Sequence, residues 1–165
     1  MAIAVVGGTM TEGMHHACPR DAYKDPSVRS NSPVVTRMQY FDLSEESNGR
    51  FPYSQAVRCG DLIFVAGQLA ADDPAFIPSI GDIESETRTA LDRIGRILAV
   101  AGSTFEDVVR VGIFMTDLDG FDTMNDVYRT YFAGSHLPAR TCVGVSRLLG
   151  GGLIEIECVA RISLK

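Results

Sequence analysis

Residues 83–116 read IESETRTALDRIGRILAVAGSTFEDVVRVGIFMT, a helical pattern that runs directly into a strand pattern. The apolar residues of its first part recur at helical spacing: Ile83, Ala90, Leu91, Ile94, Ile97, Leu98 and Ala101. Asp82 or Ser79 is placed to cap the start of this helix, and Gly102 is placed to end it. Val108–Thr116 is rich in β-branched and apolar residues at strand length. The stretch therefore predicts one helix followed by one strand.

Three strands are expected before this stretch. Val34–Leu43 reads as a strand, and Ala56–Cys59 with Leu62–Ala66 reads as a hairpin about the turn-prone pair Gly60-Asp61.

After the stretch, apolar and aromatic residues between Phe121 and Phe132 restore the helical period. Thr141–Val145 and Ile154–Ile162 then read as two strands, joined by a loop in which Gly150, Gly151 and Gly152 permit a reversal. The predicted order is βββαβαββ, an α+β fold with a six-stranded mixed sheet. Two helices cannot cover both faces of such a sheet, so we expect both on one face. An open apolar face is best buried by copies of itself, which predicts a homo-oligomer with a site at the subunit interface.

Length and charge narrow the range of functions. The 165 residues correspond to one domain, and the net charge of -6 argues against binding nucleic acid, which requires clustered Lys and Arg. The glycines, prolines and polar residues of positions 1–33 are typical of a flexible extension, which leaves 34–165 as the folded domain.

No secretory signal or membrane span is predicted at the N-terminus. The four cysteines form no CxxC pair, so free thiols in a reducing cytoplasm are expected.

Two pairs of side chains are candidates for chemistry. Residues two apart share a face of a strand, so Arg140 and Cys142 point the same way, as do Glu155 and Glu157. The guanidinium of Arg140 matches a carboxylate in a bidentate manner, although an ion pair at a surface or interface is an alternative. Glu155 lies in an apolar strand where desolvation favours its acid form, which suits a general acid or base. Alternatively, both glutamates form the solvated face of an edge strand.

Other candidates are weaker. Cys142 has no neighbouring histidine partner, since His136 lies across a proline, so a buried small hydrophobe is expected rather than a nucleophile. His15, His16 and Cys18 lack a second ligand pair with metal-site spacing, so no metal is expected. The run of three glycines is not followed by a helix or by Lys-Ser/Thr, which argues against a phosphate-binding loop.

Several segments together resemble the reactive-intermediate imine deaminase family, also called YjgF or Rid. They cover about residues 50–162 in the family's order: Pro52–Val57, Phe64–Gln68, Ala101-Gly102 with Asp107–Val109, Phe121 with Asn125 and Tyr128, Pro138–Cys142, and Ile154–Glu157. The resemblance implies a chorismate-mutase-like fold, a homotrimer with clefts at its subunit interfaces, and hydrolysis of 2-imino or 2-enamino acids to the 2-keto acid and ammonia. It implies no metal or organic cofactor.

The resemblance also implies roles for single residues. Arg140 matches the family arginine that pairs with the substrate carboxylate, and Glu155 matches the carboxylate that positions water or moves a proton. Tyr53, Asn125 and Cys142 match residues that line the same cleft, and Gly67 matches a backbone position in its wall.

The chain departs from the family pattern in ways that concern the substrate. Ala66 stands where many members have serine, and the loop Leu148–Leu153 and the N-terminal extension exceed those of the shortest members. Three alternatives therefore stay open: a pathway-specific deaminase, for example for 2-aminomuconate; a non-catalytic trimer that binds small carboxylates or acts as a chaperone-like module; and the ribonuclease activity of some relatives, which fits an acidic chain poorly.

Overall fold

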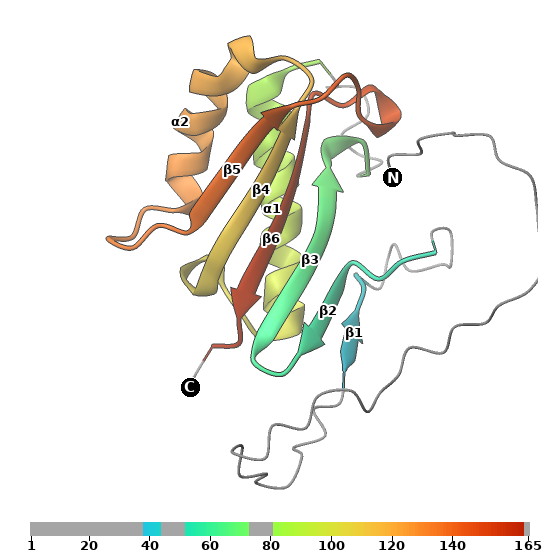
Figure 1. Cartoon of the computed structure of the whole chain (residues 1–165), viewed down its shortest axis with the longest axis vertical. Coiled ribbons are helices and arrows are strands. Elements are labelled where there is room, and N and C mark those ends of the chain that lie inside the picture. The colour runs from blue at the N-terminus through green and yellow to red at the C-terminus, as the bar shows by residue number, and fades with distance from the viewer. Residues whose placement is uncertain (1–37, 44–51, 73–80, 164–165) are drawn as a thin grey trace, which may run out of the picture. The chain divides into compact units, whose positions relative to one another are not determined.

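The computed structural model describes residues 38–43, 52–72 and 81–163, and the expected extension 1–33 lies outside these ranges. A mixed sheet has the strand order β1-β2-β3-β6-β4-β5 (Figure 1). Its strands are β1 (Gln39–Phe41), β2 (Ala56–Cys59), β3 (Leu62–Leu69), β4 (Val108–Met115), β5 (Ala139–Gly144) and β6 (Ile154–Arg161). Neighbouring strands are antiparallel except β4 and β5, which are parallel. The predicted α+β class and the order βββαβαββ are confirmed.

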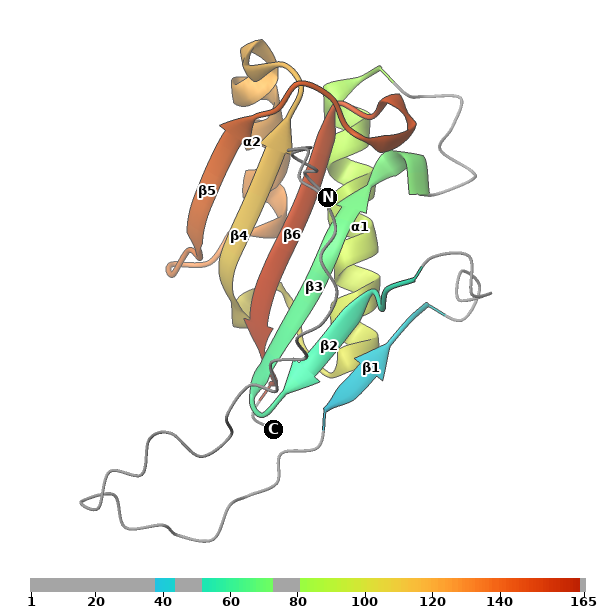
Figure 2. The ribbon, with the colours of Figure 1, turned by 45° about the vertical axis from the view of Figure 1, so that its right-hand side comes forward.

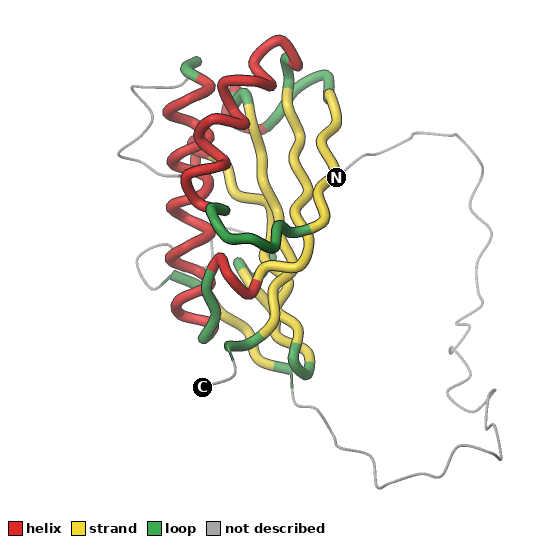
Figure 3. Tube along the Cα trace, turned by 90° about the vertical axis from the view of Figure 1, so that its left-hand side faces the viewer, coloured by secondary structure: helices red, strands yellow, loops and turns green. Residues whose placement is uncertain are grey.

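Two helices, α1 (Ile83–Ala101) and α2 (Phe121–Tyr131), lie on the same face of the sheet (Figure 3). The parallel strands β4 and β5 are joined through α2, as a parallel pair requires a crossover. The core lies between this face and the helices, and includes Ile63, Leu91, Ile94, Leu98, Val111, Ile113, Met124 and Ile156. The other face carries no helix in the described part of the chain (Figure 3).

Helix α1 begins and ends as its sequence predicts. The side chain of Asp82 accepts a hydrogen bond from the Ser85 backbone nitrogen at 3.1 Å, which satisfies one of the helix's first N–H groups. Gly102 adopts the left-handed conformation with φ 82°, and its N–H bonds back to the last turn. The alternative cap Ser79 lies outside the described residues.

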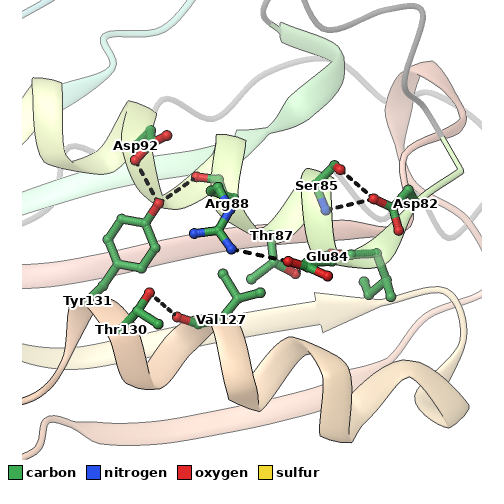
Figure 4. A network of polar contacts seen from close by, with 10 residues as sticks. Asp82, Glu84, Ser85, Thr87, Arg88, Asp92, Val127, Thr130 and Tyr131 are labelled. Carbon is green, nitrogen blue, oxygen red and sulfur yellow. Dashed lines mark hydrogen bonds and ion pairs between the residues drawn. The ribbon is translucent and has the colours of Figure 1, made fainter.

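A polar network joins α1 to α2 on the outer side (Figure 4). The hydroxyl of Tyr131 donates to Oδ1 of Asp92 at 2.7 Å and to the backbone oxygen of Arg88 at 3.3 Å. Beneath it, the Phe105 ring meets the Tyr131 and Phe132 rings edge to face. These contacts hold α2, and with it the side chains that α2 presents toward β5.

Three element boundaries differ from the sequence prediction in an informative way. β5 spans Ala139–Gly144 rather than Thr141–Val145, so Arg140 lies within the strand. The hairpin about Gly60 is confirmed, but β3 continues three residues past Ala66, through an irregularity in its pairing with β6 between Val65 and Gln68. Strand β1 is shorter than predicted, and residues 34–37 of that prediction lie outside the described ranges. The described helices include none with the length and apolar character that crossing a membrane requires.

Candidate functional site

Arg140 lies on β5, at one edge of the sheet, and packs on two rings of α2. Its Cζ is 4.7 Å from the centroid of the Tyr128 ring and 5.7 Å from that of Phe121. Such contacts engage the flat face of a guanidinium, whereas its N–H donors point outward in the plane. Within residues 38–43, 52–72 and 81–163, no carboxylate forms an ion pair with Arg140. The ring contacts therefore orient a cation whose fork suits an external carboxylate.

Asn125 and Cys142 lie beside this arginine. Phe121, Asn125 and Tyr128 follow one another at helical spacing of four and three residues, so they form one stripe of α2. Cys142 is two residues from Arg140 on the same face of β5, and its Sγ lies 3.8 Å from Sδ of Met115. We call Arg140, Asn125 and Cys142, with the rings of Phe121 and Tyr128, the anchor group.

Burial decides the protonation of the anchor group. It raises the pKa of the Cys142 thiol above its ordinary value, and the smaller opposing effect of Arg140 does not reverse this. Burial also raises the pKa of Tyr128 to about 12. Both groups are protonated at neutral pH, so the thiol lines the site as a neutral group and is not poised as a nucleophile. Cys142 is partly exposed rather than buried, so its role as a buried small hydrophobe stays a prediction.

Glu155 lies on β6 and faces the side of the sheet away from the helices. Burial raises the pKa of its half-buried carboxyl, and the charges of Asp72 and Glu157 raise it further. A carboxyl whose acid form is favoured in this way can give and take a proton closer to neutral pH than an ordinary glutamate. The predicted desolvation of Glu155 is thus borne out.

The carboxylate of Glu155 lies directly against the backbone of Gly67. A Cβ at position 67 would lie only 1.8 Å from Oε1 of Glu155, so no larger residue fits there without moving the carboxylate. Ala66 and Gly67 form a β-bulge, because the pairing of β3 with β6 shifts between Val65 and Gln68. The N–H of Ala66 bonds to the carbonyl of Gln55 at 2.9 Å, and Tyr53, two residues before Gln55, is half-exposed. We call Glu155 and Gly67 the carboxylate group.

The strand register places the two groups on opposite faces of the sheet. Arg140 and Cys142 pair with Val111 and Ile113, which are buried beneath the helices. Glu155 and Glu157 pair with Phe114 and Gly112, the residues of β4 that face the other way. Since β4 also lies between β5 and β6 (Figure 1), the predicted convergence of cation, thiol and carboxylates is wrong within one chain. The shared face within each pair is confirmed.

The alternative that the two glutamates line an edge strand is also wrong. β6 lies between β3 and β4 near the middle of the sheet, as Figure 2 shows. Oε1 of Glu157 forms a salt bridge with Nη1 of Arg110 on the neighbouring strand β4 at 3.7 Å, and both side chains are substantially exposed. Such a pair contributes little stability, and among the described residues Glu155 forms no comparable pair with a cation.

Sequence reasoning missed two buried polar residues, Gln68 and Arg93, and a buried carboxylate, Glu86. A signal existed, because Glu86, Ala90, Arg93 and Ile97 follow one stripe of α1 at spacings of four, three and four residues. Polar residues on an otherwise apolar stripe indicate a hydrogen-bonded network in the interior.

No group of three metal-ligating side chains occurs in the described part of the chain, and His15, His16 and Cys18 lie outside it.

The fold and these two groups define a class of small α+β proteins with one helix-covered face and one open face. Residues 45–162 match the family model of the endoribonuclease L-PSP proteins. The chain belongs to this family, which is also called the YjgF/RutC/Rid family.

Relatives with descriptive names support this assignment. A mitochondrial protein of Schizosaccharomyces pombe, mmf2, is 45% identical over 112 residues, which are 66% of this chain and 86% of that protein. The 2-iminobutanoate/2-iminopropanoate deaminase of Mus musculus is 39% identical over 109 residues, 66% of this chain and 80% of that protein. The crystal structure of E. coli TdcF with bound serine has a TM-score of 0.63 and 34% identity, and covers 68% of this chain and 90% of that one.

Proposed function

We propose that this protein hydrolyses small 2-imino and 2-enamino acids to 2-keto acids and ammonia. The observation that carries the proposal is the family match over residues 45–162, which spans both Arg140 and Glu155, together with relatives about 40% identical that are named 2-iminobutanoate/2-iminopropanoate deaminases. The stacked guanidinium of Arg140 and the desolvated carboxyl of Glu155 support the proposal, because they would supply a carboxylate anchor and a proton-transferring group.

Arg140 would hold the substrate carboxylate with its N–H fork, which fixes the imine carbon in place. Glu155 would then move the protons. An enamine first takes a proton at its carbon and gives up one N–H proton, which makes it the imine. Water then adds to the imine carbon and gives one proton to Glu155, which passes a proton to the nitrogen, so that a carbinolamine forms. The hydroxyl proton of the carbinolamine then passes through Glu155 to the amino group, the C–N bond breaks, ammonia leaves, and the carbon keeps the water oxygen as a carbonyl. Asn125, Cys142, Tyr53 and Gly67 would line the space around the substrate.

This chemistry requires two copies of the chain. Arg140 and Glu155 lie on opposite faces of one sheet, so one small molecule cannot meet both groups of the same chain. We therefore propose a homotrimer in which the β5 edge of one copy lies against the open sheet face of the next. The open face offers apolar surface for this contact, since Leu62 and Phe64 of β3 are 39% and 46% exposed.

The test is a trapping assay. Threonine dehydratase generates the imino acid in the presence of semicarbazide, and the trapped product is measured with and without this protein. The wild-type chain should suppress trapping and release ammonia, whereas Arg140→Ala and Glu155→Gln should not. Trapping that is unchanged by the wild-type chain across several amino acids would exclude a general deaminase.

A non-catalytic carboxylate-binding trimer is the second candidate, and the serine bound to TdcF favours it. Calorimetry with small 2-keto and amino acids separates the two functions. Binding that is lost in Arg140→Ala, with no ammonia released by the wild-type chain from any imine, would select the binding module. Ammonia release that depends on Glu155 would select the enzyme.

A further inference from the structure

A buried polar pair lies between α1 and the sheet, outside both groups described above. Arg93 of α1 and Gln68 of β3 are each only 2% exposed, and Nε of Arg93 donates to Oε1 of Gln68 at 3.1 Å. Burying a guanidinium and an amide is unfavourable unless both are hydrogen-bonded, and apolar residues commonly fill such positions equally well. The pair therefore calls for an explanation in terms of what it holds.

Gln68 holds the bulge of β3. Its Nε2 donates to the carbonyl oxygens of Ala66 and Gly67, each at 3.1 Å. These two residues are the ones that the register shift leaves out of regular pairing with β6. A bulge removes ladder partners from the backbone, and buried carbonyls need other donors. The side chain of Gln68 supplies them, and Arg93 fixes its amide in the orientation that does so.

The bulge in turn sets the position of the Glu155 carboxylate. That carboxylate lies on the backbone of Gly67, at a place where even a methyl group would meet Oε1 at 1.8 Å. Glu155 is also paired in register with Leu69, whose N–H bonds to Oδ2 of Asp72 at 3.2 Å. Movement of the bulge would therefore move the surface that holds the carboxylate.

We propose that Arg93 and Gln68 are positioning residues, which act from the helix-covered face through the carbonyls of Ala66 and Gly67 to hold Glu155 on the open face. The inference rests on the proposed function, because it takes Glu155 as the proton-transferring group. A hydrogen-bonded pair on one face of the sheet thus supports chemistry on the other.

Gln68→Met tests the proposal, because it preserves length and charge while removing both donors to the bulge. The first measurement is a ¹³C NMR titration of the Glu155 carboxyl, identified by the signal that Glu155→Gln lacks. Among the described residues, the charged groups that act on Glu155 are Asp72, Glu157 and, through Glu157, Arg110, and none of them changes in this variant. We expect the pKa of Glu155 to fall toward its ordinary value, since a released bulge admits water to the carboxyl.

The second measurement is the pH profile of deamination. A carboxylate displaced by about 1 Å should lower kcat by about 10- to 100-fold, with the limb assigned to Glu155 moving as in the NMR titration. KM should change little, because Arg140 belongs to the other group. Thr87→Val is the control, since Thr87 is a buried polar residue like Gln68, but its hydroxyl donates to the carbonyl of Ile83 in its own helix rather than to the bulge.

Unchanged titration and pH profile in Gln68→Met, with only a lower melting temperature, would overturn the proposal. If Gln68→Met does not fold, Arg93→Lys carries the test, because lysine keeps the charge but not the guanidinium geometry. We expect a smaller shift in the same direction, and no shift would again overturn the proposal. The NMR titration tests positioning even if the wild-type chain shows no deaminase activity, so failure of the proposed function is recognised separately.

Discussion

At the residue scale, Glu155 shows how a single carboxyl is prepared for proton transfer. Burial, Asp72 and Glu157 all favour its acid form, and the carboxylate lies against the backbone of Gly67. Its apolar strand made the desolvation predictable from sequence. The contribution of Asp72 was not predictable, because it depends on how the chain turns after β3.

The first prediction concerns stability as a function of pH. Because the pKa of Glu155 is raised in the folded chain, the folded state binds more protons than the unfolded state in the window between the ordinary and raised values. The stability contributed by Glu155 is present below its ordinary pKa and is lost as the pH rises through the raised one. Glu155→Gln lacks this loss, so the melting temperature of the variant minus that of the wild type should increase as the pH rises across this window. A difference in melting temperature that is the same at all pH values would contradict a raised pKa.

The second prediction concerns Gly67. In Gly67→Ala the new methyl group meets the far end of a flexible side chain, so Glu155 can move aside and the fold should be retained within about 1 kcal/mol. The displaced carboxylate should lower kcat by about 10- to 100-fold. Gly112→Ala is the matched control, because its methyl group would meet Oε1 of Glu157 at 2.8 Å instead. Equal activity of both variants would argue against a role for the Gly67 contact.

At the element scale, helix α1 contacts both segments that position Glu155: Arg93 bonds to Gln68 of β3, and Glu86 bonds to Leu153 just before β6. Its periodicity and its caps, Asp82 and Gly102, were readable from sequence because they depend on local rules. The bulge of β3 was not readable, since it arises from pairing with β6, a strand almost ninety positions further along the chain. The same holds for the bond that Glu86 accepts from the N–H of Leu153, which lies 67 positions further along the chain.

The third prediction concerns this Glu86. Its fully buried carboxylate accepts from the N–H of Gly81 and from the N–H of Leu153, each at 2.7 Å, and so ties the glycine-rich loop before β6 to the start of α1. Glu86→Gln turns an NH₂ group toward one of these donors, which should lower the free energy of unfolding by about 1 to 3 kcal/mol. Urea denaturation measures this.

The control for Glu86 lies on the same helix. Glu84→Gln removes only an exposed pair with Arg88 at 3.2 Å, and should change the free energy of unfolding by less than about 1 kcal/mol. A similar loss in both variants would mean that the loop anchor contributes nothing beyond surface charge.

At the scale of the whole molecule, the sheet separates the anchor group from the carboxylate group. Sequence alternation showed which residues share a face within each strand, because that period is local. It did not show that β5 and β6 present their candidate residues to opposite faces, because this depends on the register of both strands with β4. The resemblance to the imine deaminases, rather than strand geometry, carried the expectation of an interface site.

The fourth prediction follows from this separation. Arg140→Ala and Glu155→Gln should each be inactive alone, but subunit exchange between them should restore activity. In the proposed trimer, each site takes its arginine from one copy and its glutamate from the next. In an equal mixture, the first copy carries Arg140 in about half of the sites and the second carries Glu155 in about half, so about one quarter of wild-type activity should return. Mixing Arg140→Ala with an Arg140→Ala/Glu155→Gln double variant is the control, and should restore none. Failure of the first mixture despite exchange, shown by mass spectrometry, would place both groups in one copy.

The opposite orientation of Arg140 and Glu155 also has a kinetic consequence. If each site is made by two chains, turnover per chain depends on the fraction of chains that are assembled. When the protein is dilute, this fraction increases with protein concentration, so the reaction rate rises more steeply than in direct proportion to that concentration. On dilution, specific activity should fall together with the weight-average mass, so that the abundance of the protein itself sets how active each copy is.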